Sequence, residues 1–200
     1  MNPLWARRAM VAMLIAVLAI CGALLYQLYQ RTLTDSGATG EALIGGPFEL
    51  VDQDGKTVTD QTFKGKMMLV YFGFTYCPDA CPTALGVMSA AVDKLDVAGD
   101  RVVPMLITVD PERDTPAVLK DYVSNFHPRM MGLTGTPEQV AKAAKAYRVF
   151  YQKAPGSTPD EYLMDHTMLV YLMDGDGKYV THFGPDATPD QMADEIRKHM

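Results

Sequence analysis

Cys77 and Cys81 are the residues whose types and spacing most clearly indicate chemistry. They follow an apolar run, Met68 to Phe74, which is short and rich in β-branched and aromatic residues and therefore predicts a buried strand. Pro82 comes directly after the second cysteine, and proline suits the first position of a helix because its missing N–H would be unpaired there. We therefore expect Cys81 to be a helix N-cap, where unpaired backbone N–H groups and the helix dipole favour a thiolate.

The four-residue spacing of the two cysteines allows two kinds of chemistry. Residues four apart in a helical segment lie on one side, with Cβ atoms roughly 5–6 Å apart. With modest relaxation, Cys77 and Cys81 could close a redox-active disulfide, whose Cβ atoms lie about 3.8 Å apart, or bind one soft metal ion. The alternative is that both are small core residues. It is disfavoured because prolines flank both thiols and the first polar residues after a strand are a usual place for a site.

His166 is the candidate for a third metal ligand among the four histidines of the chain. It stands just before a predicted core strand, Thr167 to Met173, which should run beside the strand that carries the cysteines. An imidazole at this position could meet the sulfurs across the end of the sheet. The residues alone leave His166 open between a metal ligand and a loop histidine. Asp165 could orient the imidazole or simply cap a turn.

The elements that must position these residues follow one another in an α/β order. A hairpin around residues 53–55 precedes the cysteine strand, and a second strand is expected at 102–109. Helices are expected from residues 82, 115, 136 and 188, the last two opened by a Thr-Pro-x-Gln capping box. A mixed central sheet flanked by helices, with a two-cysteine loop inside a βαβ unit, predicts a thioredoxin-like fold over residues 47–200.

The N-terminal part of the sequence predicts a membrane anchor. Residues 9–29 carry no charge and are long enough to cross about 30 Å of hydrocarbon as a helix. Because arginines precede this segment, residues 1–31 are expected to form a cytoplasmic N-terminus and a single-pass transmembrane helix in the bacterial inner membrane, with the C-terminal domain in the periplasm. Residues 32–46 are rich in small and polar types and are interpreted as a flexible tether. A cleaved signal peptide is the competing interpretation.

The net charge of the chain limits the classes of partner that it can bind. The formal net charge of −6 offers no basic face for nucleic acid, so we expect no nucleic-acid partner. The segment from Asp110 to Asp114 is interpreted as a solvated loop and helix start, with a partner surface as the alternative.

Several stretches together resemble the Sco/SenC family of copper chaperones for cytochrome c oxidase. They are YFGFTYCPDACPTAL, TVDPERDTPAVLKDY, FHPRMMGLTGTPEQV, LMDHTMLVYLMD and FGPDATPDQMADEIRKHM, and the resemblance covers nearly everything from about residue 45 to the end. It implies that Cys77, Cys81 and His166 bind copper, and that the chain has a thioredoxin-like fold and a membrane anchor. It also implies a role in building the dinuclear copper centre of oxidase subunit II.

The chemistry of these residues agrees with what the resemblance implies. Two thiolates suit Cu(I), and an added imidazole gives a set that also holds Cu(II), so one copper per chain is expected. Binding requires reduced sulfurs, which calls for a thioredoxin-like reductase in an oxidising periplasm, and an upstream copper donor is a further expected partner. The alternatives are a thiol-disulfide oxidoreductase that reduces the acceptor's cysteines, a peroxiredoxin-like peroxidase, and a zinc site.

Overall fold

The structure is a computed structural model, which describes residues 10, 13, 16–17, 19–27, 44–156, 158 and 161–200. The chain divides into two compact units, Met1–Ala42 and Leu43–Met200.

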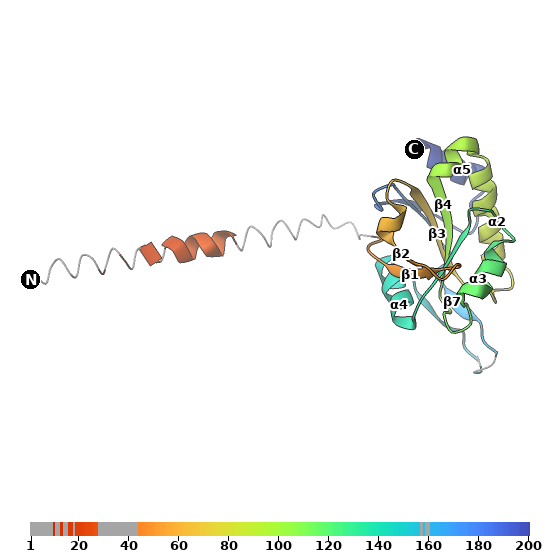
Figure 1. Cartoon of the computed structure of the whole chain (residues 1–200), viewed down its shortest axis with the longest axis horizontal. Helices are drawn as coiled ribbons and strands as arrows, with labels where there is room; N and C mark the ends of the chain where they lie inside the picture. Colours follow the sequence, from red (N-terminus) through yellow and green to blue (C-terminus); the bar gives the residue numbers. More distant parts are fainter. Residues whose placement is uncertain are drawn as a thin grey trace, which may run out of the picture. The chain divides into compact units, whose positions relative to one another are not determined.

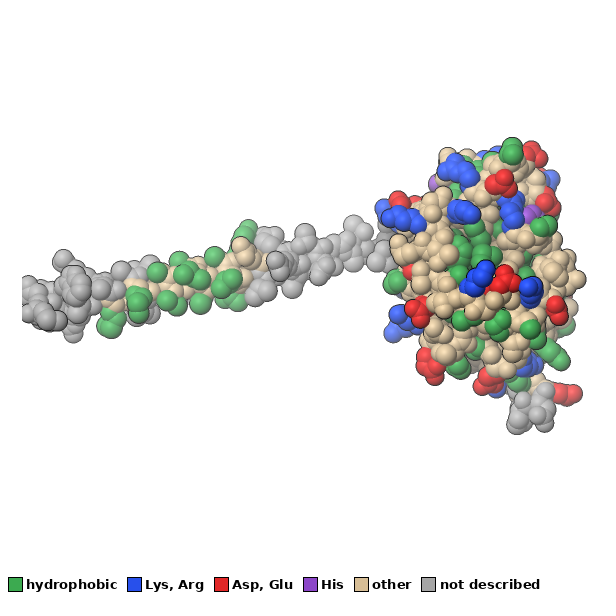
Figure 2. Space-filling model, in the orientation of Figure 1, with side chains coloured by type: hydrophobic (Ala, Val, Ile, Leu, Met, Phe, Trp, Pro, Cys, Tyr) green, Lys and Arg blue, Asp and Glu red, His purple; other side chains and the backbone are tan. Residues whose placement is uncertain are grey.

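The described residues of the first unit are helical, and their apolar side chains are exposed, Ile20 and Leu25 among them (Figures 1 and 2). Within the described part of the chain, no helix combines the length and the apolar character needed to cross a membrane. Residues 9, 11–12, 14–15, 18 and 28–29 of the predicted span lie outside the described residues, as does the predicted tether up to residue 43. The anchor and the tether therefore stay predictions.

The second unit is built on a seven-stranded mixed sheet in the order β2-β1-β5-β4-β3-β8-β9. β3 lies inside this sheet, where it pairs parallel with β4 and antiparallel with β8. All seven residues of β3 are buried, as the apolar run before the cysteines predicts. The strands are β1 (Glu49–Asp52), β2 (Thr57–Thr59), β3 (Met67–Gly73), β4 (Val102–Thr108), β5 (Met131–Thr134), β8 (Val170–Met173) and β9 (Tyr179–Phe183).

Four α-helices cover the sheet, with α2 and α3 on one side and α4 on the other (Figure 1). They are α2 (Ala80–Asp93), α3 (Pro116–Val123), α4 (Pro137–Ala146) and α5 (Pro189–Lys198), and short 3-10 helices span η1 (Asp60–Phe63) and η2 (Asp96–Arg101). Both predicted capping boxes are present, since Thr136 and Thr188 each accept a bond from the main chain of a glutamine three residues on. The thioredoxin-like arrangement of a mixed sheet between helices is confirmed.

The strand predicted over Thr167 to Met173 is wrong in its first half. Only β8 joins the main sheet, whereas β7 (Met164–His166) pairs with β6 (Tyr151–Lys153) in a separate two-stranded sheet. The chain changes partner at Thr167, whose main-chain N–H bonds the carbonyl of Phe150. His166 is therefore held by strand pairing at the end of β7, and is not a loop residue.

The surface of this unit carries charges of both signs. On the face that Figure 2 shows, Lys and Arg side chains alternate with Asp and Glu.

Candidate metal centre

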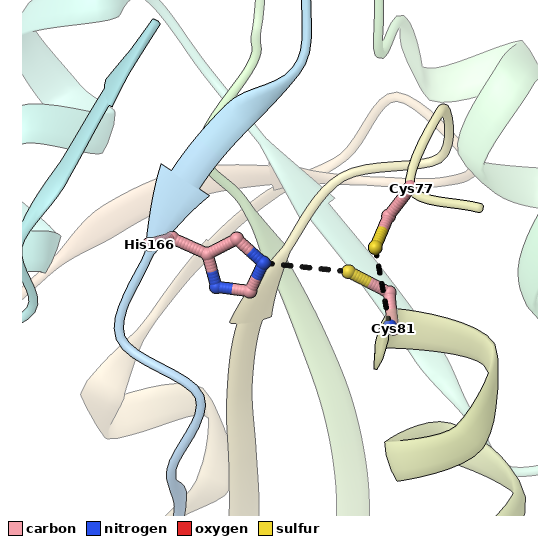
Figure 3. A group of neighbouring side chains, drawn as sticks. All are labelled: Cys77, Cys81 and His166. Carbon is pink, nitrogen blue, oxygen red and sulfur yellow. Dashed lines mark hydrogen bonds between the residues drawn. The ribbon is translucent and has the colours of Figure 1, made fainter. Parts of the chain in front are cut away.

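Three side chains from separate elements meet at one end of β3. Cys77 comes from the loop after β3, Cys81 from the first turn of α2, and His166 from the end of β7 (Figure 3). One ligand atom of each residue lies within 4.8 Å of the others, and the Cys81 Sγ is 3.6 Å from His166 Nε2. Among the described residues this is the one group of three or more His, Cys, Asp or Glu side chains close enough to share a metal ion. Two sulfurs and an imidazole nitrogen form a donor set that suits soft metal ions.

The loop that carries Cys77 is held by a buried carboxylate. The Thr75 main-chain N–H donates to Asp114 Oδ2 at 3.1 Å, and the Thr75 hydroxyl donates to Asp114 Oδ1 at 2.6 Å. The Thr108 hydroxyl at the end of β4 donates to the same carboxylate at 2.6 Å. Burial raises the pKa of Asp114, and the hydrogen bonds from the two threonines oppose that rise. Asp114 therefore ties the start of the cysteine loop to the neighbouring strand.

Cys81 is not the helix N-cap that we expect from the sequence. Asp79 is the N-cap, and α2 begins at Ala80, so Cys81 is the second helical residue and Pro82 the third. Proline fits this position because the N–H groups of the whole first turn lack helical partners. The main-chain N–H of Cys81 donates to Cys77 Sγ at 3.3 Å. The helix start therefore supports the sulfur of Cys77.

Burial also opposes the thiolate form of Cys81 that we expect from the sequence. The Cys81 side chain is fully buried, whereas Cys77 is half-buried. Burial raises the pKa of Cys81, and a hydrogen bond from the Phe74 main chain only partly opposes this rise. An anionic sulfur at this depth needs a compensating cation, which a bound metal ion supplies.

His166 presents a free nitrogen lone pair to the sulfurs. Its Nδ1 lies 3.1 Å from the Thr167 carbonyl oxygen, and because a carbonyl only accepts, Nδ1 carries the proton and Nε2 is the bare nitrogen. Burial lowers the pKa of His166, which favours the neutral imidazole that binds metal. The rings of Tyr71 and Phe74 each meet the imidazole edge-on, with centroids 5.9 Å away, and fix its plane.

Asp165 is not the residue that orients His166. It is exposed, and the bond that orients the imidazole comes from the Thr167 carbonyl. Asp165 acts on His166 through its charge alone, which raises the pKa of the imidazole against the larger effect of burial.

Gly73 is a site residue that our reading of the sequence missed. A Cβ at this position would lie 2.8 Å from Cys81 Sγ and 2.9 Å from Tyr71 Cε1. No real Cβ contact is that short, so the sulfur occupies space that only glycine leaves open. The glycine at the end of an otherwise bulky strand is the signal that could have identified it.

The segment from Asp110 to Asp114 is not a solvated loop. Asp110 and Asp114 are both buried, and Arg113 bonds Asp110 through Nε at 2.5 Å. Asp110 also accepts the Tyr162 hydroxyl at 2.7 Å, and the Arg113 guanidinium stacks on Tyr162 at 3.6 Å and on Tyr76 at 4.7 Å. The segment therefore braces the cysteine loop, because Tyr76 directly precedes Cys77.

The other histidines contact groups outside this cluster. His127 is buried against Asp93, His182 contacts Tyr179, and His199 contacts Glu195. Of the four, His166 is the histidine that meets both cysteines.

A mixed sheet between helices, with a two-cysteine loop and an opposing histidine, defines a thioredoxin-like domain with a candidate metal centre. The family model described as SCO1/SenC matches residues 36–200. The chain belongs to the SCO1/SenC family.

Relatives of known structure share the whole domain. The chain is similar to Bradyrhizobium japonicum ScoI, solved with copper bound, at 46% identity and a TM-score of 0.73, over 78% of this chain and 99% of that one. It is also similar to BsSco, described as having a disulfide switch and as a member of the Sco family of cytochrome c oxidase assembly proteins. There the identity is 28% and the TM-score 0.59, over 78% of this chain and 94% of that one.

The mitochondrial SCO1 homolog 1 of Arabidopsis thaliana is 44% identical over 82% of this chain. The match spans 49% of that relative's length.

Proposed function

We propose that Cys77, Cys81 and His166 bind one copper ion, and that the chain delivers it to the dinuclear copper centre of cytochrome c oxidase subunit II. The observation that carries this proposal is the convergence of two sulfurs and one bare imidazole nitrogen within 4.8 Å. The similarity to ScoI with copper bound supports copper as the metal, and the description of BsSco supports a role in oxidase assembly.

The donor set suits both oxidation states of copper. Two thiolates favour Cu(I), and the neutral imidazole of His166 adds the nitrogen that lets the same site hold Cu(II). Burial lowers the pKa of His166, so its imidazole stays neutral and Nε2 remains available to bind the metal. Three protein ligands leave a position open for a ligand of the acceptor.

Release of copper proceeds by ligand exchange. Cys77 is half-buried, whereas Cys81 is fully enclosed, so an incoming thiolate or imidazole reaches the ion from the side of Cys77. The large apolar side chains of Tyr76, Phe150 and Met168 are exposed near these ligands and give an acceptor a surface to contact. The ion then passes from chain to chain without being free in solution.

Loading requires both sulfurs in the reduced state, and both cysteines are free thiols in the structure. In an oxidising periplasm a thioredoxin-like reductase would maintain that state, and an upstream donor would supply the copper. In this proposal residues 9–29 anchor the chain in the bacterial inner membrane, with the N-terminus cytoplasmic and the domain periplasmic.

A thiol-disulfide oxidoreductase is the second candidate, favoured by the two cysteine sulfurs lying within 4.8 Å of each other and by the disulfide switch described for BsSco. This activity needs Cys77 and Cys81 but no neutral histidine aimed at Cys81. His166 therefore separates the two functions.

The test compares wild type with His166→Ala in the full-length reduced chain. We expect wild type to bind one copper, and the variant to lose at least about 10-fold in affinity because one of three ligands is gone. His182→Ala is the matched control, since His182 lies outside the site. Loss of binding with intact reduction of acceptor disulfides would assign the histidine to copper; unchanged binding would remove it from the site. Metal analysis of both proteins after mixing with subunit II tests delivery.

A further inference from the structure

Two buried tyrosine hydroxyls close to the cysteines have no hydrogen-bond partner among the described residues. They are the hydroxyls of Tyr71 on β3 and Tyr122 on α3. The Tyr71 side chain is 1% exposed, so solvent does not satisfy its hydroxyl from the surface. A buried donor without an acceptor costs stability, so such a group in a native protein calls for an explanation.

Tyr71 lies against the sulfur of Cys81. Tyr71 and Gly73 point to the same face of β3, because side chains alternate along a strand. A Cβ on Gly73 would touch both Tyr71 Cε1, at 2.9 Å, and Cys81 Sγ, at 2.8 Å, so the tyrosine ring and the sulfur meet above the glycine. After burial, Cys81 is the largest influence on the pKa of Tyr71. A Cys81 thiolate raises that pKa through its charge and by accepting a hydrogen bond from the hydroxyl.

The missing acceptor is a metal-bound sulfur. A neutral thiol is a weak acceptor, whereas a thiolate that binds a metal keeps lone pairs and negative charge. Hydrogen bonding by the Phe74 main chain and by the Tyr71 hydroxyl lowers the pKa of Cys81, whereas the Cys81 main-chain N–H donates to the sulfur of Cys77. The Tyr71 hydroxyl is thus the side-chain donor that stands beside the more deeply buried of the two sulfurs.

We propose that Tyr71 is a positioning residue of the copper site, whose hydroxyl donates a hydrogen bond to the Cys81 sulfur when that sulfur is a metal-bound thiolate. The inference rests on the proposed function and extends it. The bond holds the Cys81 sulfur in place and stabilises its charge at a side chain that is fully buried.

The test is Tyr71→Phe in the full-length chain, which removes one oxygen and keeps the ring against His166. We expect the affinity for Cu(I), measured by competition with bicinchoninic acid, to fall about 10- to 100-fold, as is typical when a partner of a metal ligand is lost. We expect the sulfur-to-Cu(II) charge-transfer band to move to longer wavelength, because the sulfur becomes more electron-rich. The Tm of the metal-free protein should stay unchanged or rise, because an unsatisfied buried donor is removed.

Tyr122→Phe is the matched control, because it removes the other unpartnered hydroxyl. Burial raises the pKa of Tyr122, and a Cys81 thiolate would raise it further through its charge, but the Tyr122 hydroxyl makes no hydrogen bond to Cys81. We expect wild-type Cu(I) affinity for this variant. Wild-type affinity in Tyr71→Phe would overturn the proposal. So would a loss of affinity that comes with an equal loss in Tyr122→Phe or with a lower Tm of the metal-free protein.

A second probe separates this proposal from the function on which it rests. Cd(II) is redox-inert and prefers thiolates, so it reports on the Cys81 sulfur whether or not copper is the natural metal. If wild type fails to bind Cu(I), the proposed function fails. The Tyr71 proposal then stands if Tyr71→Phe weakens Cd(II) binding relative to Tyr122→Phe, and it is overturned if the two variants bind Cd(II) equally.

Discussion

Gly73→Ala should damage the metal site more than it damages the fold. The new Cβ would lie 2.8 Å from Cys81 Sγ, whereas ordinary contacts begin near 3.4 Å. An ordinary contact therefore requires the sulfur to move by about 0.6 Å, and metal–ligand distances tolerate only about 0.2 Å. We expect Cu(I) affinity to fall at least about 10-fold. Overpacking costs about 1–3 kcal/mol, and each kcal/mol lowers the Tm of a chain of this size by about 2–4 °C.

Gly86→Ala in α2 is the matched control for this experiment. A Cβ on Gly86 meets nothing within 4 Å, so the same chemical change is free of steric conflict. Alanine in a helix interior should stabilise the protein by about 0.5–1 kcal/mol and leave Cu(I) affinity unchanged. Thermal unfolding measures the Tm of both variants, and chelator competition measures their Cu(I) affinity. Wild-type affinity and Tm in Gly73→Ala would refute the claim that the glycine reserves space for the sulfur.

Three further predictions test how the site is supported. The folded-state pKa of His166 lies below its ordinary value of 6.5, so its stabilising contribution is present above pH 6.5 and is lost as the pH falls through the lowered pKa. The free energy of unfolding in urea should therefore differ less between pH 7.5 and pH 5.5 in His166→Gln than in wild type. Asp165→Asn should change Cu(I) affinity less than about 3-fold in chelator competition, since the Thr167 carbonyl orients the imidazole, and a loss of 10-fold would restore Asp165 as the orienting group. Arg113→Leu should destabilise the domain by about 3 kcal/mol in chemical unfolding, because Asp110 remains buried without its cation. An unchanged unfolding midpoint would show that Asp110 needs no such partner.

The sequence predicts the fold well where local patterns dominate. The apolar run before Cys77 becomes β3, and the capping boxes at Thr136 and Thr188 open helices where expected. These features depend on neighbouring residues, so they are visible in one sequence. The pairing of β6 with β7 depends on residues distant in the chain, and the predicted strand from Thr167 accordingly begins too early.

The grouping of Cys77, Cys81 and His166 could be predicted from the sequence, but the residues that surround them could not. The residues alone leave His166 open, and the resemblance to Sco/SenC proteins implies that it is a ligand. The burial of Asp110 and Asp114 could not be predicted from an acidic segment, because the threonines and the arginine that satisfy them belong to other elements or become partners only after folding. Tyr71 and Gly73 lie inside an ordinary strand pattern, and their roles exist only where α2 meets β3.

The two cysteines differ in burial, which a sequence motif does not reveal. Cys81 is the second residue of a helix whose first turn packs over Gly73, so its sulfur is enclosed, whereas Cys77 precedes the helix and stays half-buried. Burial raises the pKa of Cys81, so the metal-free protein holds this residue as a thiol, and binding of a cation must release its proton. The donors around the sulfur, the Phe74 main chain and in our proposal the Tyr71 hydroxyl, lower the cost of that release. In the proposed function, Cys81 with His166 then retains the ion in the interior, while the accessible Cys77 is the ligand that an acceptor displaces first.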